Sequence, residues 1–251
     1  MKLAELTWQD VDALDREIVV LIPTGSLEQH GPHLPLFTDS ILVTAAAEAI
    51  EQQSSLLLTP TLWMGASSHH MAFSGTISAD FGTYISALQA VIDSLAEHGF
   101  RRFFVLNGHG GNNSPNDMAL RELKADNPNL MLAVRSYYSF IPDGGASVLE
   151  GPIKSIKHAC EAEASLMLHL APQLVRREKL RDDGLKGPIE GGVHHFDEVT
   201  EEGSYGYASF ASAEKGKQLL ERTSIVGCRN ELGEAVTDHA GTTTRGRGAS
   251  N

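Results

Sequence analysis

The amino-acid sequence predicts an α/β fold in which a mostly parallel sheet is covered by helices on both faces. Two observations predict it. Short apolar runs alternate with helix-like segments along the first half of the chain, and polar, glycine-containing loops follow several of the apolar runs. Such alternation is typical of parallel sheets with right-handed crossovers. Because ligands bind these sheets outside the carboxyl ends of the strands, the polar loops indicate where a site should lie.

The chain begins with a short amphipathic helix that leads into a buried strand at 18–22. Residues 40–53 are rich in alanine and glutamate, which predicts a helix with Asp39 in the N-cap position. A second buried strand, at 56–58, ends before Pro60. The following segment is full of glycine, serine and histidine, so we expect it to be irregular.

The alternation then resumes. Residues 80–98 carry apolar side chains at a period of 3.6 and end before Gly99, which predicts the clearest helix of the chain. The strand at 102–106 runs directly into the loop NGHGGN. A helix at 116–125 and a strand at 130–134 follow. We therefore expect three strand-end loops to open at one edge of the sheet.

The second half of the chain is less regular. Residues 161–170 and 211–222 predict helices, and residues 184–206 predict a long loop that contributes to the site. No internal repeat or domain boundary is visible. We expect a single catalytic domain over residues 1–240 and a disordered tail over residues 241–251, which has no large apolar side chain.

Composition excludes several classes of protein. The chain has 251 residues, 41% of them hydrophobic, and a formal net charge of −12 without a cluster of basic residues, which argues against nucleic-acid binding. No apolar run is long enough to span a membrane, and the polar N-terminal residues do not resemble a signal peptide. We expect a cytoplasmic protein. Two cysteines, Cys160 and Cys228, are too few for a disulfide framework.

The loop after the first strand carries the strongest chemical signal. Residues 22–39 read IPTGSLEQHGPHLPLFTD and contain Glu28, His30, His33 and Asp39 among glycines and prolines. We expect the glycines and prolines of this loop to bend the backbone so that Glu28 and His30 face one centre. Carboxylate and imidazole groups together suit zinc, manganese or iron. A solvated polar loop in which Asp39 only caps the next helix is equally compatible with this stretch.

Other polar clusters leave alternatives open. His109 lies among glycines at a strand end, which fits a ligand site, a tight turn or an anion-binding loop. Adjacent His69 and His70 rarely bind one metal together, so one of them is expected to contact substrate or carry a proton. His194 and His195, in the long loop, could close over a ligand; the sequence does not decide their role.

The segment HACEAEAS offers His158, Cys160, Glu161 and Glu163. The two glutamates diverge by about 200° around a helix, so at most one of them is expected to be a direct metal ligand. Both could also simply complement the helix dipole. Cys160 could be a nucleophile, but a lone cysteine is more often a small buried hydrophobe.

Taken together, these motifs resemble the creatininase family of creatinine amidohydrolase-like proteins. The resemblance rests on PTGSLEQHGPHLPLFTD at 23–39, SSHHMAFSGTIS at 67–78, NGHGGN at 107–112 and HACEAEASLML at 158–168, and more weakly on ASAEKGK at 211–217. The motifs occur in the family's order over most of the chain. The resemblance implies a three-layer α/β/α sandwich, a dinuclear metal site and a homo-oligomer, often a hexamer.

Residue by residue, the resemblance assigns Glu28 and His109 to one ion and His30 to the other, with Asp39 bridging the two. Creatininase itself has a further glutamate ligand where this chain has Gly111. Many relatives instead have a glutamate that corresponds to Glu161, so we assign the fifth ligand there, with Glu163 as the outside candidate.

A second departure concerns the substrate. A tryptophan that packs on creatinine in the family is replaced here by Lys154, a flexible cation, which argues against creatinine. Substrate contacts are expected from Ser68, His70, Gly110 and Lys154. Other members of the family act on formamides, on a peptide or on sugar-like ketones, so the resemblance constrains the mechanism more than the substrate.

The sequence therefore predicts a metal-dependent hydrolase with two divalent ions, zinc, manganese or iron, that cleaves a small non-protein amide such as a cyclic amide or formamide. Asp39 or Glu163 would move a proton, and His158 would stabilise developing charge or protonate the leaving nitrogen. The alternatives are a hydrolase of a sugar-like ketone or short peptide, a thiol amidase that uses Cys160, and a non-catalytic protein that binds a small molecule in the same pocket.

Overall fold

The computed structural model describes residues 1–186 and 192–223. Its central feature is a four-stranded sheet in the order β2-β1-β3-β4, and each neighbouring pair is parallel. The strands are β1 (Val19–Thr24), β2 (Leu56–Leu58), β3 (Arg102–Asn107) and β4 (Met131–Ser136). Each of the four apolar runs is a strand, as the sequence predicts.

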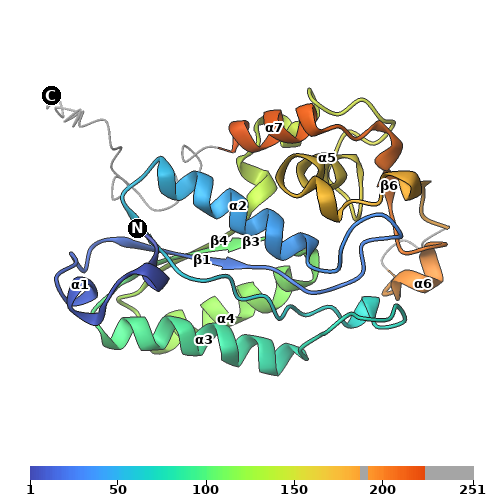
Figure 1. The fold of residues 1–251 in the computed structure, drawn as a ribbon. Coiled ribbons are helices and arrows are strands. Elements are labelled where there is room, and N and C mark those ends of the chain that lie inside the picture. Colours follow the sequence, from blue (N-terminus) through green and yellow to red (C-terminus); the bar gives the residue numbers. More distant parts are fainter. Residues whose placement is uncertain (187–191, 224–251) are drawn as a thin grey trace, which may run out of the picture.

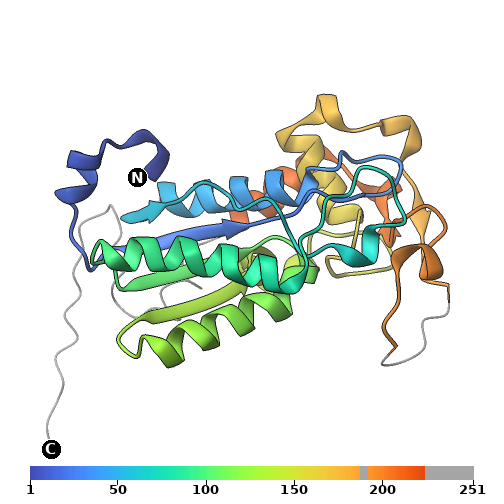
Figure 2. The ribbon, with the colours of Figure 1, turned by 90° about the horizontal axis from the view of Figure 1, so that it is seen from below.

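Helices cover both faces of this sheet, which confirms the three-layer α/β/α prediction (Figure 1). One face carries α2 (Thr38–Gln52), α5 (Glu161–Leu170) and α7 (Ala213–Arg222), and the other carries α3 (Phe81–Glu97) and α4 (Asn113–Asp126). Figure 2 shows the same layers from below, with α3 and α4 nearest the viewer. The short helix α1 (Trp8–Asp12) precedes β1 and begins with a capping box at Thr7.

The alternation of side chains along the strands divides the core in two. Leu21 and Phe104 pack into the core below α2 and α5, whereas Val20 and Phe103 pack into the core with α3 and α4. Strands that are buried on both faces need continuous apolar runs, which is why these segments lack polar alternation in the sequence.

The register of the two central strands places the carboxyl ends together. Thr24, the last residue of β1, lies opposite Asn107, the last residue of β3, and the Oγ1 and Oδ1 atoms are 3.2 Å apart. The loops that follow β1 and β3 therefore start side by side at one edge of the sheet. This is the edge that the parallel topology predicts for a ligand site.

The region 184–206 contains more structure than the predicted loop. It includes the helix α6 (Phe196–Val199), and the strand β6 (Gly206–Tyr207) pairs antiparallel with β5 (Asp182–Asp183). Residues 187–191, Cys228 and the predicted tail at 241–251 lie outside the described residues. Among the helices described, none has the length and apolar character to cross a membrane.

Close contact between α5 and α7 depends on Gly216. A Cβ atom at this position would lie 1.9 Å from the Ser165 carbonyl oxygen of α5, so only glycine fits without a shift of the helices. Gly82, near the start of α3, is exposed, and a Cβ there would meet only the Asp80 carboxylate, at 3.3 Å.

We expect Gly216→Ala to lower the free energy of unfolding by about 2 kcal/mol or more, because the methyl group forces two packed helices apart. Gly82→Ala, the matched control, should stay within about 1 kcal/mol of the wild type. Urea unfolding followed by circular dichroism measures both. Equal stability of the two variants would show that α5 and α7 separate at little cost.

Candidate metal centre

The loop after β1 bends sharply, as the metal hypothesis requires. The Glu28 N–H donates to the Leu36 carbonyl (2.9 Å), the Leu34 N–H donates to the His30 carbonyl (3.4 Å), and Gly31 adopts a φ of +61°. Glycine takes this left-handed conformation without strain. The bend turns Glu28 and His30, two residues apart, towards one centre.

Two groups of potential metal ligands meet at this centre. Glu28, Asp39 and His109 form one group, and His30, Asp39 and Glu163 form the other; within each group the ligand atoms lie within 4.8 Å of one another. Asp39 belongs to both. Its Oδ1 atom is 3.0 Å from His30 Nε2, and its Oδ2 atom is 3.0 Å from His109 Nδ1.

Each of these side chains is held by the elements around it. Asp39 lies in the first turn of α2, and the Ser26 hydroxyl donates to its Oδ2 atom (2.8 Å). His109 follows β3, and the Asn107 side-chain amide donates to its carbonyl oxygen (2.7 Å). Glu163 lies in the first turn of α5. The centre is therefore preorganised by hydrogen bonds and by the starts of two helices.

Burial makes this centre suitable for cations. Glu28, Asp39 and Glu163 are at most 6% exposed, so three carboxylates are withdrawn from water at one point. Both carboxylate oxygens of Glu28 and the Oε2 atom of Glu163 lack a hydrogen-bond partner among the described residues. Buried charges need compensation by pairing or by metal coordination. The unpartnered oxygens and the mixed oxygen and nitrogen donors fit divalent metal ions.

The histidines supply part of the compensation. Burial disfavours charge on His30, but the Asp39 carboxylate outweighs it and raises the pKa of His30 to about 9. Burial also opposes charge on His109, yet Glu28 and Asp39 raise its pKa well above the usual range. Burial raises the pKa of Glu163 to about 7. Protons bound to these three side chains thus offset part of the negative charge at this centre.

Glu161, the expected fifth ligand, lies apart from both ligand groups in the structure. Its carboxylate accepts hydrogen bonds from the backbone N–H groups of Glu150 (2.9 Å) and Gly151 (2.8 Å), and its Oε1 atom pairs with Lys215 Nζ at 2.7 Å. It belongs to neither ligand group, whereas Glu163 belongs to one. The two glutamates leave α5 in different directions, and only Glu163 points to the centre. We therefore place Glu163 in the proposed ligand set.

The centre forms the floor of a pocket of about 210 Å³. Two expected substrate contacts, His70 and Gly110, line it. The other two do not. Ser68 is exposed, while its neighbour Ser67 is buried with its hydroxyl 3.2 Å from His109 Nε2. Lys154 donates to the Leu149 carbonyl (2.6 Å) and is absent from the pocket lining. In each case another residue of the same type lines the site, Ser67 beside His109 and Lys157 in the pocket lining.

The aromatic side chains that line this pocket were not predicted from the sequence. Tyr138 and Phe196 line the pocket, and the Phe196 ring lies 4.7 Å from the His158 ring, centroid to centroid. The long loop does contribute to the site, as expected, but through Phe196. His194 instead has its Nδ1 atom 3.8 Å from Glu198, and His195 is the N-cap of α6. The sequence signal for this contribution is that Phe196 is a lone phenylalanine in an otherwise polar loop.

Cys160 does not have the environment of a nucleophile. Its side chain is 3% exposed, and it is absent from the pocket lining. Burial raises the pKa of the thiol to about 12, which disfavours the reactive thiolate. Cys160 is therefore a buried hydrophobe in the core below α2 and α5.

Comparisons with known proteins agree with the fold. The family model described as "Creatininase: Creatinine amidohydrolase" matches residues 4–225. The creatinine amidohydrolase of Pseudomonas putida is 33% identical, over 87% of this chain and 91% of its own length. A mycofactocin precursor peptide peptidase of Mycobacterium tuberculosis is also 33% identical, over 80% of this chain and 79% of its own.

Solved structures of creatininases show the same fold. A mutant creatininase of the Zn-Zn type superimposes with a TM-score of 0.79 at 30% identity, covering 92% of this chain and 98% of its own. A manganese creatininase gives 0.76 at 29% identity with the same coverage. The fold and the centre thus define a metal-dependent hydrolase. The chain belongs to the creatininase family, as the sequence motifs indicate, and is a metal-dependent amidohydrolase of that family.

Substitution of one carboxylate at a time should show which of the two glutamates of α5 binds metal. We expect Glu163→Gln to lose at least half of the bound metal, because a neutral amide replaces a ligand. Glu161→Gln, the matched control two residues away, should keep its metal and lose only stability. Plasma mass spectrometry of the purified variants measures metal per chain. Loss of metal from Glu161→Gln alone would restore the original assignment.

Metal uptake by the metal-free protein should release protons. At about pH 7, His30 and His109 carry protons, because their pKa values are raised, and an ion requires the free lone pairs. The apparent affinity for zinc should therefore strengthen as the pH rises towards 9. Calorimetric titration in two buffers of different ionisation enthalpy measures the release. Heats that do not depend on the buffer would contradict it.

Proposed function

We propose that the centre holds two divalent ions, with Asp39 as the shared ligand. Glu28 and His109 would complete the ligands of one ion, and His30 and Glu163 those of the other. The observation that carries this proposal is the position of Asp39, whose two oxygens each lie 3.0 Å from a histidine of a different ligand group. Zinc, manganese and iron all suit these oxygen and nitrogen donors.

Ions in these positions supply acidity to a bound water and polarise a substrate carbonyl. The chain supplies the proton transfers. His158 lines the pocket, and its Nδ1 atom is 3.7 Å from Glu28 Oε1. Burial, followed by the proximity of His30, lowers the pKa of His158 well below its usual value, so the ring is neutral and keeps a lone pair. His158 would accept a proton on this lone pair and pass it to the leaving nitrogen, while Asp39 and Glu163 orient the water.

We propose a small non-protein amide, a cyclic amide or a formamide, as the substrate. The pocket is small, at about 210 Å³, and the aromatic rings of Tyr138 and Phe196 offer a flat apolar wall beside the centre. This wall also changes the argument about creatinine. Lys154 lies outside the pocket, whereas Lys157 lines it, so the charge of Lys154 is no argument against a flat ring, and creatinine belongs among the candidates to be tested.

Other substrates have support in single relatives. The peptidase from Mycobacterium tuberculosis is a peptide-cleaving relative, and a 3-dehydro-scyllo-inosose hydrolase of Thermotoga maritima is 29% identical over 81% of this chain and 73% of its own. A sugar-like ketone or a short peptide is therefore the second choice. A non-catalytic binding protein is less compatible with a neutral His158 that is half-buried in the pocket wall.

We further propose a homo-oligomeric, cytoplasmic protein with a single domain up to residue 240. Exposed large apolar side chains gather in the segment between β2 and the start of α3, which is typical of a subunit interface; they are Trp63, Met71, Ile77 and Phe81. The free, buried thiol of Cys160 fits a reducing compartment. Size-exclusion chromatography with light scattering would give the number of subunits.

The function is tested by metal content and turnover together. Wild-type protein purified without chelator should contain about two ions per chain, and Asp39→Asn should lose most of both, because it removes the shared ligand. The metal-loaded wild type is then screened on amides, formamides and lactams, creatinine included. Asp39→Asn should be at least 100-fold slower.

Cys160→Ala is the control, and it should keep both its metal and its activity. Turnover by wild-type protein that contains no metal, or loss of turnover in Cys160→Ala with metal retained, would contradict the proposed mechanism and favour thiol chemistry.

A further inference from the structure

The side-chain amide of Gln29, between the ligands Glu28 and His30, has a defined orientation. Its Oε1 atom accepts a hydrogen bond from the Gly31 N–H (2.9 Å), and its Nε2 atom donates to the Gly203 carbonyl oxygen (2.9 Å). A backbone N–H can only donate and a backbone carbonyl can only accept. The two ends of the amide are therefore identified by their partners, and no reversed orientation satisfies both.

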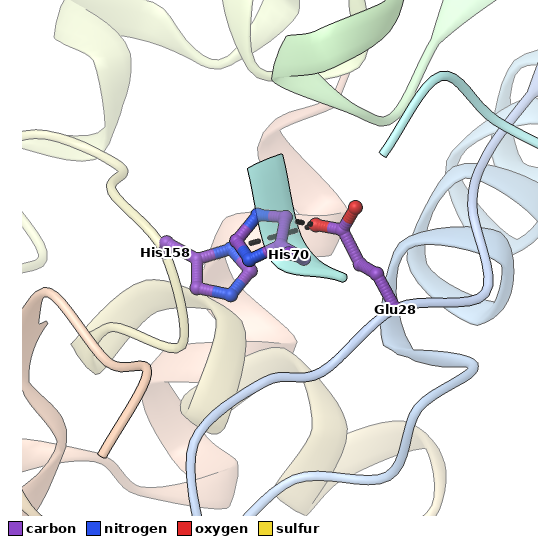
Figure 3. A group of neighbouring side chains, drawn as sticks. All are labelled: Glu28, His70 and His158. Carbon is purple, nitrogen blue, oxygen red and sulfur yellow. Dashed lines mark ion pairs between the residues drawn. The ribbon is translucent and has the colours of Figure 1, made fainter. Parts of the chain in front are cut away.

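This orientation determines which ring nitrogen of His70 carries the hydrogen. Gln29 Nε2 lies 2.8 Å from His70 Nδ1. Since the amide nitrogen is a donor, Nδ1 must be the acceptor, and the hydrogen of the neutral ring is on Nε2. That Nε2 atom lies 3.3 Å from Glu28 Oε1 (Figure 3). His70 therefore presents an N–H group, not a lone pair, to the carboxylate.

The main chain of Gln29 does the same for His158. The Nε2 atom of His158 is 2.8 Å from the Gln29 carbonyl oxygen, which can only accept, so Nε2 carries the hydrogen. Gln29 Nε2 also lies 3.1 Å from this nitrogen, but its two hydrogens are donated to Gly203 and His70, so this contact is not a hydrogen bond. The lone pair is then on Nδ1, which faces Glu28 Oε1 at 3.7 Å (Figure 3). Both rings have the same tautomer, but His70 turns its N–H and His158 turns its lone pair towards the same carboxylate oxygen.

We propose that Gln29 is a positioning residue that fixes the tautomers of His70 and His158, so that His158 is available as a proton acceptor and His70 is excluded as a metal ligand. Glu28, His70 and His158 lie close enough to hold an ion. With its hydrogen on Nε2, however, His70 has no lone pair on the nitrogen that faces Glu28, and its Nδ1 lone pair accepts from Gln29, so this group does not form a third metal site. The role of His158 in turnover rests on the proposed function; the tautomers do not.

A distant segment holds Gln29 in this orientation. Gly203, which supplies the carbonyl for Gln29 Nε2, has a φ of +79°, and a Cβ atom there would lie 2.1 Å from Gln29 Oε1. The Gly203 N–H is in turn held by Thr200 Oγ1 (3.1 Å). The segment that follows α6 thus reaches the centre through Gln29, and glycine at 203 is required both by the backbone and by the amide.

The tautomers are read directly by long-range ¹H–¹⁵N NMR of zinc-loaded protein labelled in its histidine rings. Signals of His70 and His158 are assigned from their loss in His70→Asn and His158→Asn. We expect wild-type protein to show the hydrogen on Nε2 in both rings. A hydrogen on Nδ1 of either ring would overturn the proposal, and this result does not depend on any variant of Gln29 being folded.

The variant Gln29→Glu tests whether the amide of Gln29 fixes the tautomer of His70. A carboxylate of the same shape cannot donate to His70 Nδ1, so the protonated and unprotonated nitrogens of His70 should exchange places. Gln53→Glu, an exposed glutamine on the surface, is the matched control and should leave both rings unchanged. If Gln29→Glu is unfolded, Gln29→Met, which removes the donor without adding charge, should give a mixture of His70 tautomers. An unchanged His70 in a folded Gln29 variant would overturn the proposal.

Gly203→Ala provides an independent test, because its methyl group displaces the Gln29 amide. It should alter the His70 signals, whereas Gly184→Ala, where a Cβ meets nothing within 4 Å, should not. Metal content of Gln29→Glu is measured in parallel; an extra ion per chain would show that His70 has become a ligand. If wild-type protein hydrolyses no amide, the proposed function fails while the NMR result still decides the tautomers.

Discussion

The burial of three carboxylates at one point is the constraint on which the rest of the structure depends. Glu28, Asp39 and Glu163 are almost completely withdrawn from water, and an isolated buried carboxylate is strongly unfavourable. The protein compensates with two histidines whose pKa values are raised, and it leaves carboxylate oxygens of Glu28 and Glu163 without hydrogen bonds. Such a centre favours the binding of cations.

The sheet makes this arrangement possible because it fixes two distant loops against each other. β1 and β3 pair over their full length and end at the same level, at Thr24 and Asn107. The loop after β1 brings Glu28 and His30, and the loop after β3 brings His109. Asp39 begins α2, so its carboxylate lies where the two loops meet. Apolar packing on both faces of the strands thus sets the distances between charged groups.

Around this centre, neutral polar groups determine the orientation of the charged side chains and of the histidine rings. Ser26 donates to Asp39, Asn107 donates to the His109 carbonyl, and Gln29 is fixed by backbone groups on both sides. These contacts contribute little charge but decide which oxygen and which ring nitrogen faces the pocket. Groups of this kind around a metal site orient its ligands and tune their basicity.

Much of this protein was determined by local sequence. Continuous apolar runs predicted the four strands, and residue type in the glycine- and proline-containing loops made Glu28, His30, Asp39 and His109 candidates, which the resemblance to the creatininase family turned into a proposed ligand set. Tertiary structure alone decided between Glu161 and Glu163. Helical geometry shows that the two diverge by about 200°, but the rotation of α5 about its axis depends on its packing against α2 and α7. For the same reason Lys154, Ser68 and Phe196 were misjudged or missed, since residue type is local information and the direction of a side chain is not.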